Sequence, residues 1–98
     1  MDEKYLFQNQ TTNVDGAAIS LSPLERFGEF INRTLYLSGT MDGATFSLLA
    51  NDGTSYIVVT DSSITTSPTV KNISIRSDYI KGRLSGGGVN MNDTVAIV

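Results

Sequence analysis

Cysteine and histidine are both absent from this chain of 98 residues. Their absence removes disulfide bonds, the usual zinc ligands and the nucleophile–base pairs on which most hydrolases depend. Tryptophan is also missing, and no apolar run approaches the ~20 residues that a membrane-spanning helix needs. Residues 2–4 are charged, and no apolar leader follows them. The sequence therefore predicts a protein that is made in a reducing cytoplasm.

Charge is sparse as well, at 17% of the residues with a formal net charge of −3. The basic residues are dispersed, which predicts neither a nucleic-acid partner nor a membrane partner. Carboxylates are the remaining candidates for catalysis, but Glu25 and Glu29 share one local segment, whereas glycosidases need two carboxylates across a cleft. The aspartates do not follow a calcium-loop spacing. We therefore predict no enzyme, no catalytic residue, no metal site and no cofactor.

Two Asp-Gly dipeptides, Asp42-Gly43 and Asp52-Gly53, are the strongest local signal that is present. Asp-Gly supplies the left-handed backbone that tight hairpin turns require. Apolar and polar residues alternate around these turns, and the run 56–59 is apolar on both faces. Such a run is typical of a central strand, or of a strand whose outer face is covered by another subunit.

These patterns predict an all-β protein with about seven or eight short strands and no substantial helix. A small antiparallel β-sandwich of Ig-like or jelly-roll type fits best, and a small closed barrel is the alternative. One helical turn is predicted near residues 24–30, after Ser22-Pro23. The run Gly86-Gly87-Gly88 is predicted to be a flexible connection between strands, because neither a helix nor a lysine follows it as in a phosphate-binding loop.

The first sixteen residues differ from the rest, because Tyr5-Leu6-Phe7 is an apolar cluster in a polar stretch without sustained alternation. We predict that residues 1–16 form an N-terminal arm or an edge strand, and that residues 17–98 form the β-sandwich domain. An arm could reach a neighbouring subunit, and deleting residues 1–14 would then leave the domain folded.

Apolar side chains that fall opposite the inferred core face are candidates for a protein interface. The predicted interface consists of Tyr36, Leu49 and Tyr79 on the strands, together with Tyr5, Leu6 and Phe7 of the N-terminal cluster. A chain of this size gains stability from association, so we also predict a homo-oligomer, with a trimer favoured.

Three stretches, residues 43–48, 51–56 and 78–87, resemble a class of small structural proteins of tailed bacteriophages. The pattern of that class is a strand, an "SNDGT"-like turn ahead of an aromatic residue, then "YIRA-LSGG" and a final apolar strand. The resemblance covers residues 35–98. It implies a virion protein, either a capsid decoration (cement) protein or a neck or tail adaptor. Its partners would then be the major capsid protein or other virion proteins, and it would be made in the cytoplasm of the bacterial host.

A carbohydrate-binding module for receptor recognition is the alternative of a different class. Tyr36, Tyr56 and Tyr79 could stack under sugar rings. The absence of tryptophan, which offers the largest stacking face, disfavours this alternative.

Overall fold

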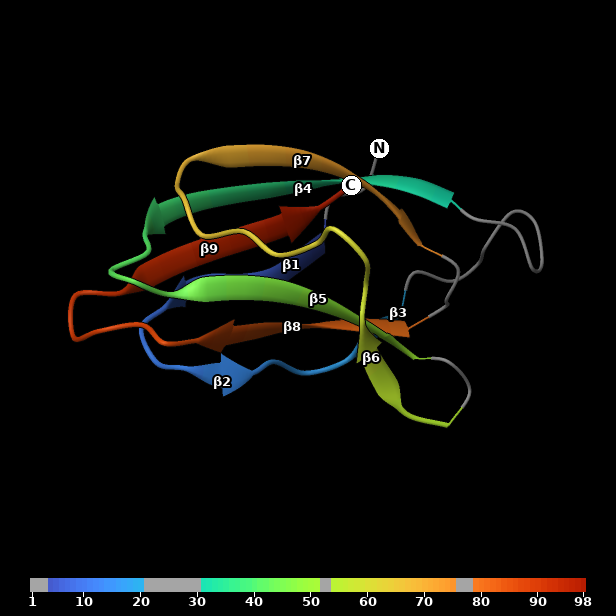
Figure 1. Ribbon diagram of the computed structural model, residues 1–98, viewed down its shortest axis with the longest axis horizontal. Coiled ribbons are helices and arrows are strands. Elements are labelled where there is room, and N and C mark those ends of the chain that lie inside the picture. Colours follow the sequence, from blue (N-terminus) through green and yellow to red (C-terminus); the bar gives the residue numbers. More distant parts are fainter. Residues whose placement is uncertain (1–3, 21–30, 52–53, 76–78) are drawn as a thin grey trace.

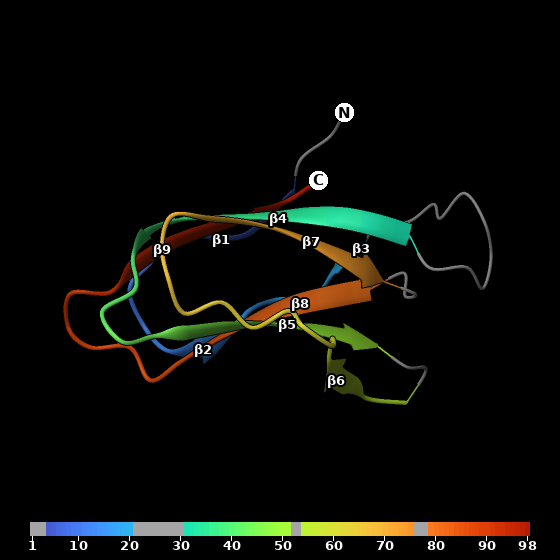
Figure 2. The same cartoon turned by 45° about the horizontal axis from the view of Figure 1, so that its top comes forward.

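The computed structural model describes residues 4–20, 31–51, 54–75 and 79–98, and every regular element in these ranges is a β-strand. The strands are β1 (Lys4–Gln10), β2 (Val14–Asp15), β3 (Ile19–Ser20), β4 (Ile31–Thr40), β5 (Thr45–Asn51), β6 (Tyr56–Val58), β7 (Thr69–Ile75), β8 (Tyr79–Ser85) and β9 (Asn92–Ile97). They form two layers (Figures 1 and 2). Sheet A has the order β1-β9-β4-β7, and sheet B has the order β2-β8-β5-β6 with β3 also paired to β8.

The strand order identifies the sandwich as a jelly roll. β1 pairs with β9, β2 and β3 pair with β8, β4 pairs with β7, and β5 pairs with β6, all antiparallel. These nested pairs are what results when one long hairpin is rolled so that successive pairs fall alternately in two sheets. The prediction of a small antiparallel β-sandwich is confirmed. The sequence predicted either an Ig-like or a jelly-roll type, and the jelly roll is the one observed. The two sheets remain separate, so the closed-barrel alternative is wrong.

The core lies between the sheets and is filled mainly by alternate residues of β4, β5, β7, β8 and β9. Its largest fully buried members include Leu35, Phe46, Leu48, Ile80 and Ile97. The alternation that predicted the strands is thus the alternation that fills the core.

The first Asp-Gly turn is confirmed as a tight reverse turn between β4 and β5. Asp42 and Gly43 both have positive φ, 46° and 83°, and the amide of Ala44 donates to the carbonyl of Met41 over 2.9 Å. Positive φ at both central residues defines the type I′ turn. The second turn at Asp52-Gly53 and the predicted helical turn near residues 24–30 lie outside the described residues.

The glycine run before β9 is held more firmly than its composition predicts. The side-chain amide of Asn13 accepts from the Gly87 amide over 2.8 Å and donates to the Gly87 carbonyl over 3.0 Å. A carboxylate oxygen of Asp42 accepts from the Asn90 amide over 2.9 Å. The loop is therefore anchored from two sides, by the β4–β5 turn and by the β1–β2 connection.

The N-terminal segment is an edge strand and not an arm, because β1 pairs with β9 along its length. Leu6 and Phe7 are 8% and 5% exposed and belong to the core. The pairing register shifts between Tyr5 and Phe7, as at a β-bulge. This irregularity lets two consecutive side chains be buried, and it removes the alternation that would have predicted a strand. The domain therefore begins at β1 rather than at residue 17.

Asp93 is an exception among the inward-facing residues of β9. Its side chain has no exposed surface, and neither carboxylate oxygen has a hydrogen-bond partner among the described residues. Burial raises the pKa of this carboxyl above its ordinary value, because an ionised group loses its hydration inside the core.

This raised pKa predicts a dependence of stability on pH. The folded state binds the Asp93 proton more tightly than the unfolded chain does, so the stabilisation is full below about pH 4 and is lost as the pH rises through the folded-state pKa. Asp93→Asn keeps the shape and cannot ionise. The free energy of unfolding of Asp93→Asn, relative to the native protein, should therefore increase as the pH is raised above about 4. Urea unfolding at several pH values measures this difference, and a constant difference would contradict the prediction.

Candidate interaction surface

The six residues of the predicted interface fall into two groups. Tyr5, Tyr36 and Tyr79 are 45%, 46% and 51% exposed, as a contact surface requires. Leu6 and Phe7 lie in the core, so their prediction as interface residues is wrong for the folded protein, for the reason given by the irregular register of β1. Leu49 is only 1% exposed.

Tyr5 and Tyr36 belong to one continuous row across sheet A. The register pairs Tyr5 of β1 with Ala96 of β9, Ala96 with Tyr36 of β4, and Tyr36 with Val70 of β7. Side chains directly opposite each other in an antiparallel sheet share one face and lie in contact distance. We call these four residues the tyrosine row; it spans three strand spacings, about 14 Å.

The row lies on the outer face of sheet A, away from the core. Tyr36 alternates with the buried residues Leu35 and Leu37, so its ring points to the opposite side of β4. Ala96 is only 6% exposed although it does not belong to the core cluster. We attribute this burial to the flanking tyrosine rings, which the register places on either side of it. Val70 at the end of the row is 65% exposed.

The rest of this outer face is polar but uncharged. Its described residues beside the row are Asn32, Thr34, Ser38, Thr40, Asn72, Ser74, Asn92 and Thr94. Hydrogen bonds join neighbouring strands, from Thr34 Oγ1 to Asn72 Oδ1 over 3.0 Å and from Ser74 Oγ to Asn32 Oδ1 over 2.8 Å.

The charged residues of the sheet A strands lie on the other side. Lys71, Arg33 and Asp93 are paired in register with the inward positions Leu35, Ile73 and Gly39. Lys4 pairs with the core residue Ile97, and its ammonium group donates to the carbonyl of Ser20 in sheet B. The outer face of sheet A therefore combines exposed tyrosine rings with amide and hydroxyl groups and carries no charge among the described residues.

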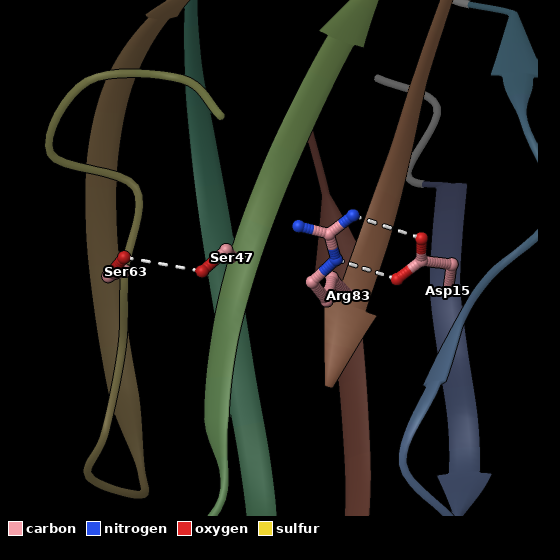
Figure 3. A network of polar contacts seen from close by, with 4 residues as sticks. All are labelled: Asp15, Ser47, Ser63 and Arg83. Atoms are coloured by element: carbon pink, nitrogen blue, oxygen red, sulfur yellow. Dashed lines mark hydrogen bonds and ion pairs between the residues drawn. The ribbon is translucent and has the colours of Figure 1, made fainter. Parts of the chain in front are cut away.

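The outer face of sheet B is different, because it carries charged groups that are paired with each other. Arg83 on β8 holds Asp15 on β2 in a two-pronged ion pair, with Nε 2.7 Å from Oδ1 and Nη2 3.1 Å from Oδ2 (Figure 3). The hydrogen bond from Arg83 lowers the pKa of Asp15. The pair is solvent-exposed, so its contribution to stability is small. Figure 3 also shows Ser47 of β5 and Ser63 of the loop between β6 and β7, whose hydroxyls are 3.3 Å apart.

Leu49 lies on this outer face of sheet B but is covered by its neighbours. It is not a member of the core cluster, and the register places Lys81 of β8 and Val58 of β6 on either side of it. The Lys81 ammonium lies 4.6 Å from the centre of the Tyr56 ring. The aliphatic stem of Lys81 thus runs across Leu49 to reach Tyr56. The prediction that Leu49 points away from the core is correct. The prediction that it is exposed for contact with a partner protein is wrong, because its neighbours cover it.

The tyrosines that were predicted to stack under a sugar are not brought together. Tyr36 lies on sheet A, while Tyr56 and Tyr79 lie on the strands of sheet B. Ala96 and Val70, which complete the tyrosine row, were not predicted, because cross-strand neighbours depend on register and register is not visible in single-strand alternation.

Among the described residues, no group of three or more acidic side chains is placed to hold a metal ion. The same residues contain no helix long and apolar enough to span a membrane.

Comparison of the chain with known protein families, curated proteins and solved structures gives no match in any of the three.

Proposed function

We propose that this protein is a non-enzymatic structural protein of a tailed-bacteriophage virion, namely a capsid decoration (cement) protein. In this role it stabilises the head through subunit–subunit and subunit–capsid contacts. The observation that carries the proposal is the uncharged outer face of sheet A with its tyrosine row. The resemblance of residues 35–98 to small virion proteins and the use of the jelly roll by viral capsid proteins support it.

The chemistry of this face suits a lasting protein contact. Charged groups are costly to dehydrate, whereas an uncharged face with amide and hydroxyl groups can exchange its water for a partner's hydrogen bonds. Interface cores are enriched in tyrosine and depleted in charged residues. Tyr5 and Tyr36 are then the anchors of the contact, and the capsid surface formed by the major capsid protein is the partner. The protein is made in the bacterial cytoplasm and binds the capsid as a trimer. A position in the neck or tail of the virion is the alternative to the capsid.

The double variant Tyr5→Ser/Tyr36→Ser tests this proposal. Full burial of a large side chain contributes roughly 1.5–3 kcal/mol, so loss of two anchors should weaken binding to capsids that lack the protein by about a hundredfold or more. Co-sedimentation with such capsids measures the affinity and the number of copies bound. The fold should be retained, because both side chains are about half exposed.

Tyr79→Ser is the matched control, because it removes the same kind of side chain at similar exposure from sheet B. Its capsid binding should equal that of the native protein. Two results would show that the outer face of sheet A is not the docking surface: capsid binding by the double variant that equals that of the native protein, or an equal loss of capsid binding in the double variant and in Tyr79→Ser.

Carbohydrate binding is the second candidate, and one observation favours it. Tyr36 is surrounded on its own face by Thr34 and Asn72, so an exposed ring lies next to hydroxyl and amide groups. This combination is what a sugar requires, and the jelly roll is also a lectin fold. Specific binding on a glycan array that is lost in Tyr36→Ser and retained in Tyr79→Ser, without capsid binding, would replace the first proposal by this one.

A further inference from the structure

A cleft of about 550 Å³ opens between the edge strands of the two sheets, β6 of sheet B and β7 of sheet A. Residues 72–75 form one wall and residues 57–61 form the other. Successive side chains of a strand point to opposite faces, so the wall formed by the four consecutive β7 residues 72–75 is the backbone edge of that strand. The other wall is the end of β6 and the turn that follows it.

The hydrogen bonding of sheet A shows which backbone groups of β7 face the cleft. Thr34 of β4 exchanges two backbone hydrogen bonds with Val98, each of 3.0 Å, so the amide and carbonyl of Thr34 point away from β7. In an antiparallel strand this direction alternates from residue to residue. Arg33 and Leu35 therefore bond to their partners Ile73 and Lys71 on β7.

By the same alternation, the amides and carbonyls of Asn72 and Ser74 point away from β4 and into the cleft. Among the described residues, no backbone hydrogen bond from another strand or loop reaches them. An edge with unpaired amides and carbonyls is a template on which another extended chain can pair.

The opposite wall supplies apolar surface. Ile57 and Val58 are 54% and 49% exposed on β6. The sequence around them is apolar on both faces, which is typical of a central strand or of a strand that another subunit covers. β6 is an edge strand, so it is not a central strand. The remaining explanation is that another polypeptide covers its exposed face.

Charge further restricts the cleft and its occupant. The Lys71 ammonium donates to the carbonyl of Ser63 over 3.3 Å, so the neighbouring half of β7 is blocked by an inward-pointing charge that is tied to the loop beside it. The open part is residues 72–75, a length of about 13 Å. Among the described residues that line the cleft, Asp61 is the only charged one.

We propose that this cleft binds an extended peptide segment of a partner protein, which pairs as an added strand with the edge of β7. The amide and carbonyl groups of Asn72 and Ser74 bond to the peptide backbone. Apolar residues at alternate positions of the peptide pack against Ile57, which shares the inward face of sheet B with Ala50, and a lysine or arginine of the peptide lies beside Asp61. This site lies on the sheet edge and goes beyond the face proposed for capsid docking, so either proposal stands if the other fails.

Ser74→Pro is the variant that tests the backbone pairing. Proline removes the amide that faces the cleft, while the ladder to β4 is left intact because the amide of Ser74 does not take part in it. The probes are fluorescent octapeptides that alternate valine and threonine, with one threonine replaced by lysine at each polar position in turn. Fluorescence anisotropy should show saturable binding of at least one peptide to the native protein and at least tenfold weaker binding to Ser74→Pro.

Val70→Pro is the matched control, because the amide of Val70 also points to the free edge but Val70 does not line the cleft. Its peptide binding should stay within twofold of the native protein.

Asp61→Asn should weaken binding of the lysine-containing peptide severalfold and leave binding of the peptide without lysine unchanged. Asparagine suits this position because Asp61 has a left-handed backbone with φ of 61°.

A peptide that is N-methylated at alternate residues, tested on the native protein, keeps the proposal falsifiable if Ser74→Pro does not fold. Its binding should be lost, because N-methylation removes the donors that strand pairing needs. Equal binding of methylated and unmethylated peptides, equal binding by Ser74→Pro, or no saturable binding of any peptide at millimolar concentration would overturn the proposal.

Discussion

Replacing Phe7 with alanine is expected to destabilise the protein by about 3–5 kcal/mol, the range for removing a buried phenylalanine. Phe7 is 5% exposed, and its ring meets that of Phe46 edge to face with 6.3 Å between the centroids. The ring also covers Gly16 and Gly82, so alanine would leave a cavity that bridges β1 and β8. Since small domains are stable by only ~5–15 kcal/mol, the loss is a large part of the total. Urea unfolding monitored by circular dichroism measures it.

Tyr5→Ala is the control for this effect, because Tyr5 lies on the same strand with its ring on the outer face. We expect a cost below about 1 kcal/mol there. Equal costs at the two positions would mean that β1 is not part of the fold. For the same reason, deletion of residues 1–14, which the arm prediction would tolerate, is now expected to abolish folding.

The fold class follows from local patterns, whereas the topology does not. Alternation in β4, β5 and β8 and the Asp42-Gly43 turn predict short antiparallel strands, and all of these are observed. Distinguishing a jelly roll from an Ig-like sandwich requires knowing that β1 pairs with β9, two strands at opposite ends of the chain. No local pattern encodes a pairing at that separation, and the register shift in β1 hides the strand itself.

The candidate surface was predictable to a similar extent. The outward direction of Tyr36 and Leu49 follows from period two, but exposure depends on neighbours that belong to other strands. Lys81 lies beside Leu49 and covers it, whereas the residues directly paired with Tyr36 are the short Ala96 and Val70, and Tyr36 stays half exposed. The uncharged character of the face emerges only when the inward positions of Lys71, Arg33 and Asp93 are known.

Gly82→Val is expected to destabilise the protein by about 3 kcal/mol, in the upper part of the range for overpacked cores. A Cβ atom at Gly82 would lie 2.7 Å from Cε2 of Phe7 and 2.9 Å from Cε1 of Phe46. Gly82 occupies an inward position between the buried residues Ile80 and Leu84. The two aromatic rings therefore fill the space that a side chain on β8 would take, and both would have to move. Thermal unfolding should show a lower melting temperature.

The cause of this effect can be separated from a simple change in strand propensity by a double-mutant cycle. Gly82→Ala in the native background introduces the clash, whereas Gly82→Ala combined with Phe7→Leu introduces the same methyl group next to a smaller side chain. If the steric explanation is correct, the cost of Gly82→Ala is smaller in the Phe7→Leu background, with a coupling of about 0.5–3 kcal/mol. Strictly additive costs would show that the ring of Phe7 is not what excludes a side chain at position 82. The ring of Phe46, which lies 2.9 Å from the same Cβ position, would then be the remaining steric cause, and the packing of β1 onto sheet B would have to be explained by other contacts.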